Sequence, residues 1–245
     1  MWQFILKPLK RIINTVWSAS CLFCQAPEQT TTVCAACLHD LPWLINACWS
    51  CAQPLTTSQA PPNYCGRCLQ KSPAFDRTLA LFHYQKPITY LISALKFNKK
   101  LAYAKFLGDL LAEHLPKHYE NDSLPECLIP LPLHPARTRQ RGFNQSFLLA
   151  HRIAKHLKLA INTTACQRIK NTTTQRGLNS QQRQKNMRQA FSIAPNFAAK
   201  HVVIIDDVVT TGSTVHALSR LLKQRGVQRV DVWSVARTSI AYTKY

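Results

Sequence analysis

The segment from His201 to Thr214 constrains the fold more than any other stretch of the chain. It contains four apolar β-branched residues (202–205), two adjacent aspartates, two valines and a hydroxyl-rich turn. The apolar run predicts a strand buried on both faces of a parallel sheet, and the leucine pattern after the turn predicts a helix. Open α/β sheets bind their ligands at the carboxyl ends of such strands. The segment therefore predicts a ligand site.

The groups that follow the predicted strand suit a phosphorylated sugar. Asp206 and Asp207 can accept hydrogen bonds from sugar hydroxyls or hold a metal ion that bridges to a diphosphate. The turn 210–214 opens a helix, whose first N–H groups and positive dipole end favour an anion. Gly212 lets the backbone come close, and the Thr and Ser hydroxyls can donate to phosphate oxygens. A buried strand with two solvated acids and a Ser or Thr helix cap is the alternative interpretation.

Charge is distributed very unevenly along the sequence. The formal net charge is +20, from 31 Lys and Arg against 11 Asp and Glu. Between Cys127 and Ile205 there is no carboxylate, whereas thirteen Lys and Arg fall there. Such a field attracts polyanions, either a nucleotide diphosphate or a nucleic-acid backbone. The candidate nucleic-acid contacts are Arg139, Arg141, Arg176, Arg183, Lys185 and Arg188.

Eight of the ten cysteines form four Cys-x-x-Cys pairs within the first 68 residues. Two such pairs supply the four sulfur ligands of a tetrahedral zinc ion, and nothing in the sequence directs export to an oxidising compartment where disulfides persist. We expect consecutive pairs to share one structural zinc ion, although an interleaved pairing or a single ion also fits the spacing. The expected ligands are Cys21, Cys24, Cys34 and Cys37, then Cys48, Cys51, Cys65 and Cys68.

Residues 1–18 have apolar residues at helical spacing, so we predict an amphipathic helix there. Lys7, Pro8, Lys10 and Arg11 interrupt the apolar pattern that a signal peptide would need. No apolar run is long enough to span a bilayer. We expect a cytoplasmic protein whose first helix docks on its own surface, with the inner face of the membrane as the alternative.

Three segments follow from these patterns: the helix at 1–18, a double zinc ribbon at 19–70 and an α/β domain at 76–240. In the α/β domain the apolar patterns predict alternating strands and helices, which favours a parallel sheet. The expected strands are Thr78–Tyr84, Cys127–Leu131, Asn162–Cys166, Val202–Ile205 and Val230–Ala236. The expected helices begin near Pro87, Leu101, Ser146 and Thr214.

The proline-rich turn Pro130–Arg137 follows a predicted strand, so it can face the same crevice as Asp206. Arg137, Arg139 and Arg141 concentrate donors suited to diphosphate oxygens, and a merely solvated basic loop is the alternative. The long polar segment 168–188 is predicted to be a lid over the substrate, because loops of this length inside compact domains are usually functional or disordered.

The combination of these features resembles the ComF family of bacterial proteins linked to competence, over nearly the whole chain from Cys21 to Arg237. The order of strand, Asp-Asp, two apolar residues and Thr-Thr-Gly-Ser-Thr also resembles the phosphoribosyl diphosphate (PRPP) signature of type I phosphoribosyltransferases. Besides the four cysteine pairs, the matching segments are Ile92-x-x-Leu-Lys-Phe97, Pro130-Leu-Pro-Leu-His-Pro135, Arg141-Gly-Phe-Asn-Gln145, Gln175-x-x-Leu178, Arg183-x-x-Asn186, Ala190-Phe191 and Asp206-Asp-Val-Val-Thr-Thr-Gly212.

The resemblance implies a type I phosphoribosyltransferase-like parallel sheet flanked by helices, preceded by a small double zinc ribbon. It also implies that Asp206 and Asp207 hold the ribose hydroxyls of PRPP, act as the catalytic pair, and work with Mg²⁺. Lys96 and Arg137 would lie near the diphosphate. The residues of the loop that would hold the 5-phosphate are Val208, Val209, Thr210, Thr211, Gly212, Ser213 and Thr214.

Two functions remain open at this point. One is a PRPP-binding protein that serves DNA uptake, with single-stranded DNA and competence-machinery proteins as partners. The other is an active phosphoribosyltransferase that transfers the sugar to an unidentified base or amine without touching DNA. A fold alone does not decide between them.

Overall fold

A computed structural model describes residues 20–27, 32–56, 62–120, 122–170 and 190–239. The chain divides into two compact units, residues 1–41 and residues 42–245. The helix predicted at 1–18 and most of the lid predicted at 168–188 lie outside the described residues. The boundaries predicted from the sequence at residues 19, 70, 76 and 240 stay predictions.

The described part of the first unit is built around its cysteines. A bridge between Ser20 and Pro27 closes the first cysteine turn, where the Cys21 amide donates to Ala26 at 2.8 Å. The short helix α2 (Ala35–His39) begins directly after Cys34. Few apolar side chains are buried here, so a metal ion has to supply the cohesion that a core supplies elsewhere.

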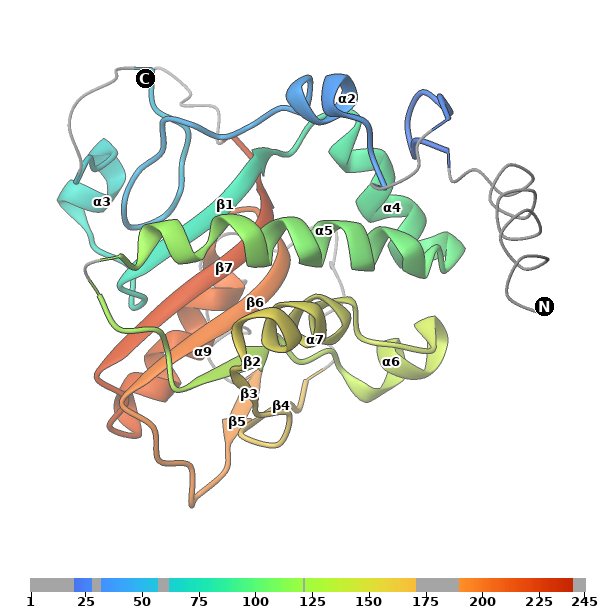
Figure 1. The fold of residues 1–245 in the computed structure, drawn as a ribbon. Helices are drawn as coiled ribbons and strands as arrows, with labels where there is room; N and C mark the ends of the chain where they lie inside the picture. Colours follow the sequence, from blue (N-terminus) through green and yellow to red (C-terminus); the bar gives the residue numbers. More distant parts are fainter. Residues whose placement is uncertain (1–19, 28–31, 57–61, 121, 171–189, 240–245) are drawn as a thin grey trace, which may run out of the picture. The chain divides into compact units, whose positions relative to one another are not determined.

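The second unit contains a five-stranded sheet in which every described pairing is parallel, with strand order β1-β7-β6-β2-β3 (Figure 1). The most apolar strands lie at its centre, because a parallel sheet is buried on both faces. The strands are β1 (Arg77–His83), β2 (Cys127–Pro130), β3 (Ala160–Ile161), β6 (His201–Val209) and β7 (Arg229–Arg237). The predicted α/β fold with a parallel sheet is therefore confirmed.

Helices cover both faces of this sheet: α5 and α7 cross the front face in Figure 1, and α9 lies behind it. Gly108 of α5 allows the close approach of α7, because a Cβ there would lie 2.6 Å from the Cβ of Arg152. The helices that the structure describes in this unit are α3 (Gly66–Gln70), α4 (Ile88–Asn98), α5 (Leu101–His114), α6 (Pro135–Arg141), α7 (Gln145–Leu157) and α9 (Ser213–Gln224), with a 3₁₀ turn η1 (Pro116–His118).

Two predictions about local structure were wrong. The expected strand Asn162–Cys166 is instead a turn, in which the Asn162 side chain accepts from the Thr164 and Ala165 amides, and strand pairing resumes only at Cys166. That strand, β4 (Cys166–Arg168), forms a separate antiparallel pair with β5 (Phe191–Ile193). The proline-rich turn is also shorter than expected, because Pro135 begins α6. The turn at Asn162 forms because Asn side chains readily accept hydrogen bonds from the amides that follow them.

The second cysteine segment belongs to the core of the second unit. Cys48, Cys51, Cys65 and Cys68 are all buried, and they belong to the same apolar cluster as Val209 and Val215. Residues 42–44 run along the edge of β1, where the Leu44 amide donates to Leu81 and the His83 amide to Pro42, each at 2.8 Å. An edge covered in this way cannot recruit other strands.

A buried carboxylate anchors the amino end of β7. Asp231 is fully buried and accepts a 2.7 Å hydrogen bond from the Tyr119 hydroxyl, while His201 Nε2 lies 3.1 Å away and Arg229 pairs with it at 2.9 Å. Burial alone would raise the pKa of Asp231, but these hydrogen bonds hold it below the usual range. Trp233 completes the network by donating to the Tyr119 oxygen at 3.0 Å.

Candidate ribose-phosphate site and cysteine clusters

Strand β6 carries both predicted carboxylates within the sheet rather than after it. β6 continues to Val209, and Asp206 pairs with Ser234 of β7 in register. Asp206 and Asp207 are 8% and 3% exposed, so the alternative of two solvated acids is wrong. The strand extends four residues beyond the predicted apolar run, to Val209, and Val208 and Val209 are themselves good strand formers.

The two carboxylates have different environments. Burial and the neighbouring Asp207 charge raise the pKa of Asp206 well above its usual value, although Lys96 and a 2.9 Å bond from the Asp207 amide oppose this. Asp207 is held from two helices: Lys96 forms an ion pair with Oδ2, and Gln145 Nε2 donates to Oδ1 at 3.0 Å. Nearby groups therefore balance the negative charge of Asp207, whereas that of Asp206 is poorly balanced.

Helices α4 and α7 bring these partners to the end of β6. Lys96 lies in the last turn of α4 and Gln145 in the first turn of α7, where Asn144 caps the helix by accepting from the Ser146 amide at 2.9 Å. The Gln145 side chain also accepts a hydrogen bond from Arg141. Gln145 was not predicted as a site residue. It stands in a segment on which the family resemblance rests, which is the signal that could have found it.

The loop between β6 and α9 turns into the helix at Gly212. Gly212 adopts a φ of +77°, which L side chains rarely adopt, and it directly precedes α9. Thr211 Oγ1 lies 2.9 Å from Ser213 Oγ and accepts from the Ser213 amide at 3.3 Å. Thr210, Thr211 and Ser213 are exposed. The loop thus presents hydroxyls beside the first turn of a twelve-residue helix.

Two arginines hold this loop from the side of the second cysteine segment. Arg237, which is fully buried, donates from Nη1 to the Val209 carbonyl at 3.1 Å and to that of Thr210, and from Nε to the Cys51 carbonyl at 2.8 Å. Arg67 donates to the Thr211 carbonyl at 3.3 Å. Neither was predicted as a site residue, because their partners are far away in the sequence.

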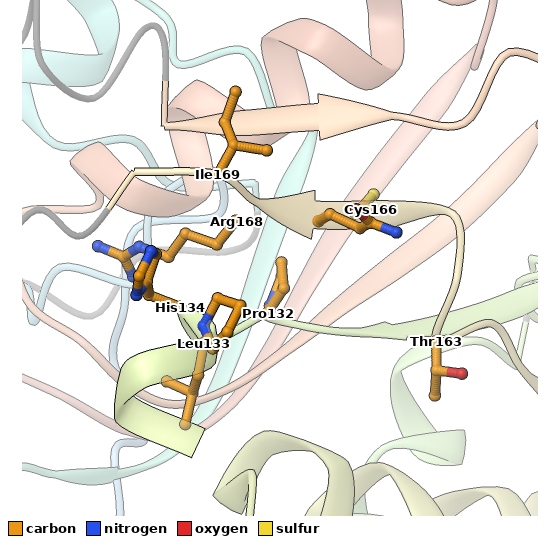
Figure 2. A pocket seen from close by; sticks show the side chains of 9 residues that line it. Pro132, Leu133, His134, Thr163, Cys166, Arg168 and Ile169 are labelled. Atoms are coloured by element: carbon orange, nitrogen blue, oxygen red, sulfur yellow. The ribbon is translucent and has the colours of Figure 1, made fainter. Parts of the chain in front are cut away.

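A hollow of about 370 Å³ opens between the segment 132–135 and β4 (Figure 2). His134 and Arg168 line it together with Thr163. His134 Nδ1 accepts from the Ala136 amide at 3.2 Å, so the neutral ring carries its proton on Nε2. The hollow therefore combines proline and leucine surface with hydrogen-bond donors.

Arg168 lines this hollow, and the sequence predicted it only as the first residue of the lid segment 168–188. Burial and the charge of Arg137 lower the pKa of Arg168, while the charge of Asp206 raises it, so its guanidinium lies in the electrostatic reach of both groups. Its guanidinium also faces the Phe191 ring at 5.6 Å. Arg137 itself lies half-buried on α6.

Only part of the predicted nucleic-acid set falls on described residues. Arg139 is exposed on α6, and Arg141 is half-buried with its guanidinium 5.8 Å from the Phe97 ring. The remaining predicted contacts, Arg176, Arg183, Lys185 and Arg188, lie outside the described residues. Phe97 is 73% exposed and Tyr90, two turns earlier on α4, is 60% exposed.

The eight paired cysteines gather into two groups of four, as the sequence predicted. Within each group all four sulfurs lie within 4.8 Å of one another, and no cysteine of the described residues forms a disulfide. Cys24 and Cys34 Sγ are 3.7 Å apart, as are Cys51 and Cys65 Sγ. Tetrahedral zinc with a Zn–S distance of about 2.3 Å requires sulfurs about 3.8 Å apart. Both groups therefore fit structural zinc.

The ionisation of the thiols in the second group (Cys48, Cys51, Cys65 and Cys68) also favours a bound metal ion. Hydrogen bonding from Cys51 lowers the pKa of Cys48 to about 4, whereas burial raises the pKa of Cys68 to about 12. Hydrogen bonding to Cys48 raises the pKa of Cys51 as well. Four buried thiols cannot all ionise without a cation among them, and thiolates are the form that binds metal.

Comparison with known proteins identifies the family. Residues 144–242 match the phosphoribosyl transferase domain, and residues 12–69 match the double zinc ribbon domain. Competence protein F of Haemophilus influenzae is 36% identical over 195 residues, covering 78% of this chain and 84% of that protein. The chain belongs to the ComF family. DNA utilization protein YhgH of Salmonella typhimurium is 33% identical, and the match covers 89% of this chain and 96% of that protein. Competence protein ComFC of Streptococcus pneumoniae is 26% identical, and the match covers 64% of this chain and 67% of that protein.

The two family matches contain most of the candidate site residues of this ComF protein. The double zinc ribbon match contains both cysteine groups, which supports structural zinc. The phosphoribosyl transferase match contains both aspartates and the loop 208–214, whereas Lys96 and Arg137 precede it. Among the helices that the structure describes, none has the length and hydropathy to cross a membrane.

Proposed function

We propose that this protein binds PRPP at the end of β6 and serves DNA uptake in the cytoplasm together with competence-machinery proteins. One observation carries the proposal: the carboxylates of Asp206 and Asp207 directly precede a hydroxyl-rich loop whose Gly212 opens α9. The carboxylates suit the ribose hydroxyls, and the loop with the first turn of α9 suits the 5-phosphate. Relatives named for competence and DNA utilization support the role in DNA uptake.

Lys96 is placed to respond when the ribose of PRPP binds, because it pairs with one of the two carboxylates. Without ligand it neutralises Asp207, whose side chain is 4% exposed. A ribose hydroxyl that donates to Asp207 would release Lys96 toward the diphosphate, whose charge attracts it more strongly. Adjacent carboxylates also suit Mg²⁺, which prefers oxygen ligands and would supply charge neutralisation of the diphosphate. Arg137 would add a further cation on the same side.

Active transfer is the alternative function. A nitrogen acceptor would attack C1 of the ribose while the C1–O bond to diphosphate breaks, so that the bond electrons leave with diphosphate and the acceptor loses a proton. The hollow lined by His134 and Arg168 favours this alternative, because it offers an acceptor molecule a place with hydrogen-bond donors, and the charge of Asp206 acts on Arg168. These donors suit a heterocycle or amine that carries carbonyl or carboxylate oxygens.

Calorimetric titration with PRPP and Mg²⁺ tests the binding proposal. The variant Asp206→Asn with Asp207→Asn should lose two hydrogen bonds to charged acceptors, each worth about 1.5–3 kcal/mol. Binding should therefore weaken by more than a hundredfold, since about 1.4 kcal/mol is tenfold in affinity. The control is Asp40→Asn with Glu113→Gln, which removes the same two charges at exposed positions.

Equal affinity of the wild type, the site variant and the control would overturn the proposed site. Loss of affinity in the control as well would mean that net charge, rather than the carboxylate pair, governs binding. Release of diphosphate during incubation with PRPP, Mg²⁺ and a panel of bases and amines would establish the transferase alternative. Binding without release for the whole panel would favour a PRPP-binding role without transfer.

An exposed aromatic surface on α4 favours contact with single-stranded DNA as part of the same function. Tyr90 and Phe97 lie on one side of α4, and Tyr103 of α5 packs 6.3 Å from Tyr90. Exposed Lys99 and Lys100 come two and three residues after Phe97. Aromatic rings that stack on bases beside cations that bind phosphates are the usual means of holding single strands.

Fluorescence anisotropy with an oligothymidylate tests this contact. Tyr90→Ala with Phe97→Ala should weaken binding by about tenfold or more, since each stacked base contributes about 1–3 kcal/mol. Ile45→Ala with Leu69→Ala removes similar exposed apolar surface elsewhere and serves as the control. Equal effects of both double variants, or an affinity that does not fall with salt, would contradict the proposal.

A further inference from the structure

The second cysteine cluster (Cys48, Cys51, Cys65 and Cys68) lies close to the ribose-phosphate loop through two arginines. Arg67 stands between two of the ligand cysteines, and its Nη2 donates to the Thr211 carbonyl at 3.3 Å. Arg237 also reaches the cluster, since its Nε donates to the Cys51 carbonyl at 2.8 Å. The loop is thus connected directly to the cysteine turns.

Arg237 is a buried cation among apolar residues. It ends β7, is fully buried, and binds the carbonyls of Val209, Thr210 and Thr238 through Nη1. Its Nη2 has no hydrogen-bond partner in the part of the chain that the structure describes. A buried guanidinium requires nearby negative charge, because moving it out of water is costly.

A metal-loaded cluster supplies that charge. Four thiolates around one divalent zinc ion have a net charge of −2, and Arg237 and Arg67 lie beside them. The same two cations fix three consecutive carbonyls of the loop, those of residues 209–211. Loss of the metal would release the cysteine turns that position Arg67 and the Cys51 carbonyl, so the loop would lose the hydrogen bonds that hold it.

We infer that Arg237 and Arg67 are positioning residues through which zinc in the second cluster, and not in the first, fixes the loop 208–214 for phosphate binding. The inference rests on the proposed function for its binding consequence. The first cluster (Cys21, Cys24, Cys34 and Cys37) belongs to the other compact unit. The two zinc sites of one chain therefore have different roles.

The experiment compares full-length variants by zinc content, by hydrogen exchange of the loop amides and by PRPP titration with Mg²⁺. Cys48→Ser with Cys51→Ser should lose one zinc, speed exchange at 208–214 and weaken PRPP binding at least tenfold. Cys21→Ser with Cys24→Ser is the matched control, which should also lose one zinc but leave loop exchange and PRPP affinity unchanged.

Variants of the arginines keep the test valid if the cysteine variant fails to fold. Arg67→Met should retain both zinc ions yet speed exchange at 208–214 and weaken PRPP binding about threefold to tenfold, as expected for one hydrogen bond. Arg67→Lys should restore part of the affinity, because it keeps the charge. Arg237→Lys keeps the charge but loses the forked geometry, and should loosen the loop with zinc retained.

Wild-type exchange and affinity in both Arg67→Met and Arg237→Lys would overturn the inference. An equal effect of the two cysteine double variants would also overturn it, since the first cluster would then matter as much as the second. If the wild type does not bind PRPP, the proposed function fails, while loop exchange after loss of the second zinc still decides the coupling.

Discussion

Replacing Asp206 by Asn should stabilise the protein while it removes a ligand group. Burial and the adjacent Asp207 charge raise the pKa of Asp206, so the folded state binds a proton more tightly than the unfolded state does. The unfolded carboxyl ionises near pH 3.9. As the pH rises above that value, the unfolded carboxyl ionises while the folded one stays protonated, so the folding stability conferred by Asp206 falls until the folded-state pKa is passed. Asn avoids this penalty.

The expected gain is about 1–3 kcal/mol at pH 8, the usual cost of a buried polar group that its surroundings do not compensate. Asn keeps the one hydrogen bond seen here, because its Oδ1 can accept from the Asp207 amide, which lies 2.9 Å from the present carboxylate oxygen. For a chain of this size each kcal/mol shifts Tm by roughly 2–4 °C. Urea unfolding of variant and wild type from pH 4 to pH 8 should show a difference in the free energy of unfolding that widens with pH and then levels off.

Asp207→Asn is the matched control, because the neighbouring acid has partners. It would lose the ion pair with Lys96, whose side chain is 23% exposed, so stability should fall by about 1–3 kcal/mol. The two adjacent substitutions should therefore change stability in opposite directions. An Asp206→Asn protein that is less stable at pH 8, or a gap that shrinks as pH rises, would refute the reasoning.

Three further outcomes are expected. Gly108→Ala should destabilise the second unit by about 1–3 kcal/mol in urea unfolding, because the new Cβ would lie 2.6 Å from that of Arg152, whereas Gly66→Ala, which meets nothing within 4 Å, should have little effect. Tyr119→Phe should cost about 1.5–3 kcal/mol by losing its 2.7 Å bond to the buried Asp231, and an unchanged midpoint would contradict the charge-assisted bond. Chelation should remove two zinc ions per chain by metal analysis, and release of only one would contradict two complete sites.

Local patterns were sufficient for most elements of the second unit. The strand before Asp206, the helix after Gly212 and the helix that begins at Leu101 follow from apolar periodicity and turn chemistry, which depend on neighbours in the sequence. The turn at Asn162 was missed because an Asx turn and a strand have similar composition over five residues. The sequence also led us to expect that consecutive cysteine pairs share a site, but its spacing left interleaved pairing open, and the structure decided between them.

The sequence by itself determined which chemical groups this ComF protein has: paired thiols, paired carboxylates and a hydroxyl-rich loop at the end of a buried strand. Only the tertiary structure decided how those groups are charged and held. The difference between Asp206 and Asp207 depends on Lys96 from α4 and Gln145 from α7, and the link from Cys51 to the loop depends on Arg237. Burial and long-range contacts set these properties, because electrostatic energy depends on distances in space rather than on order along the chain.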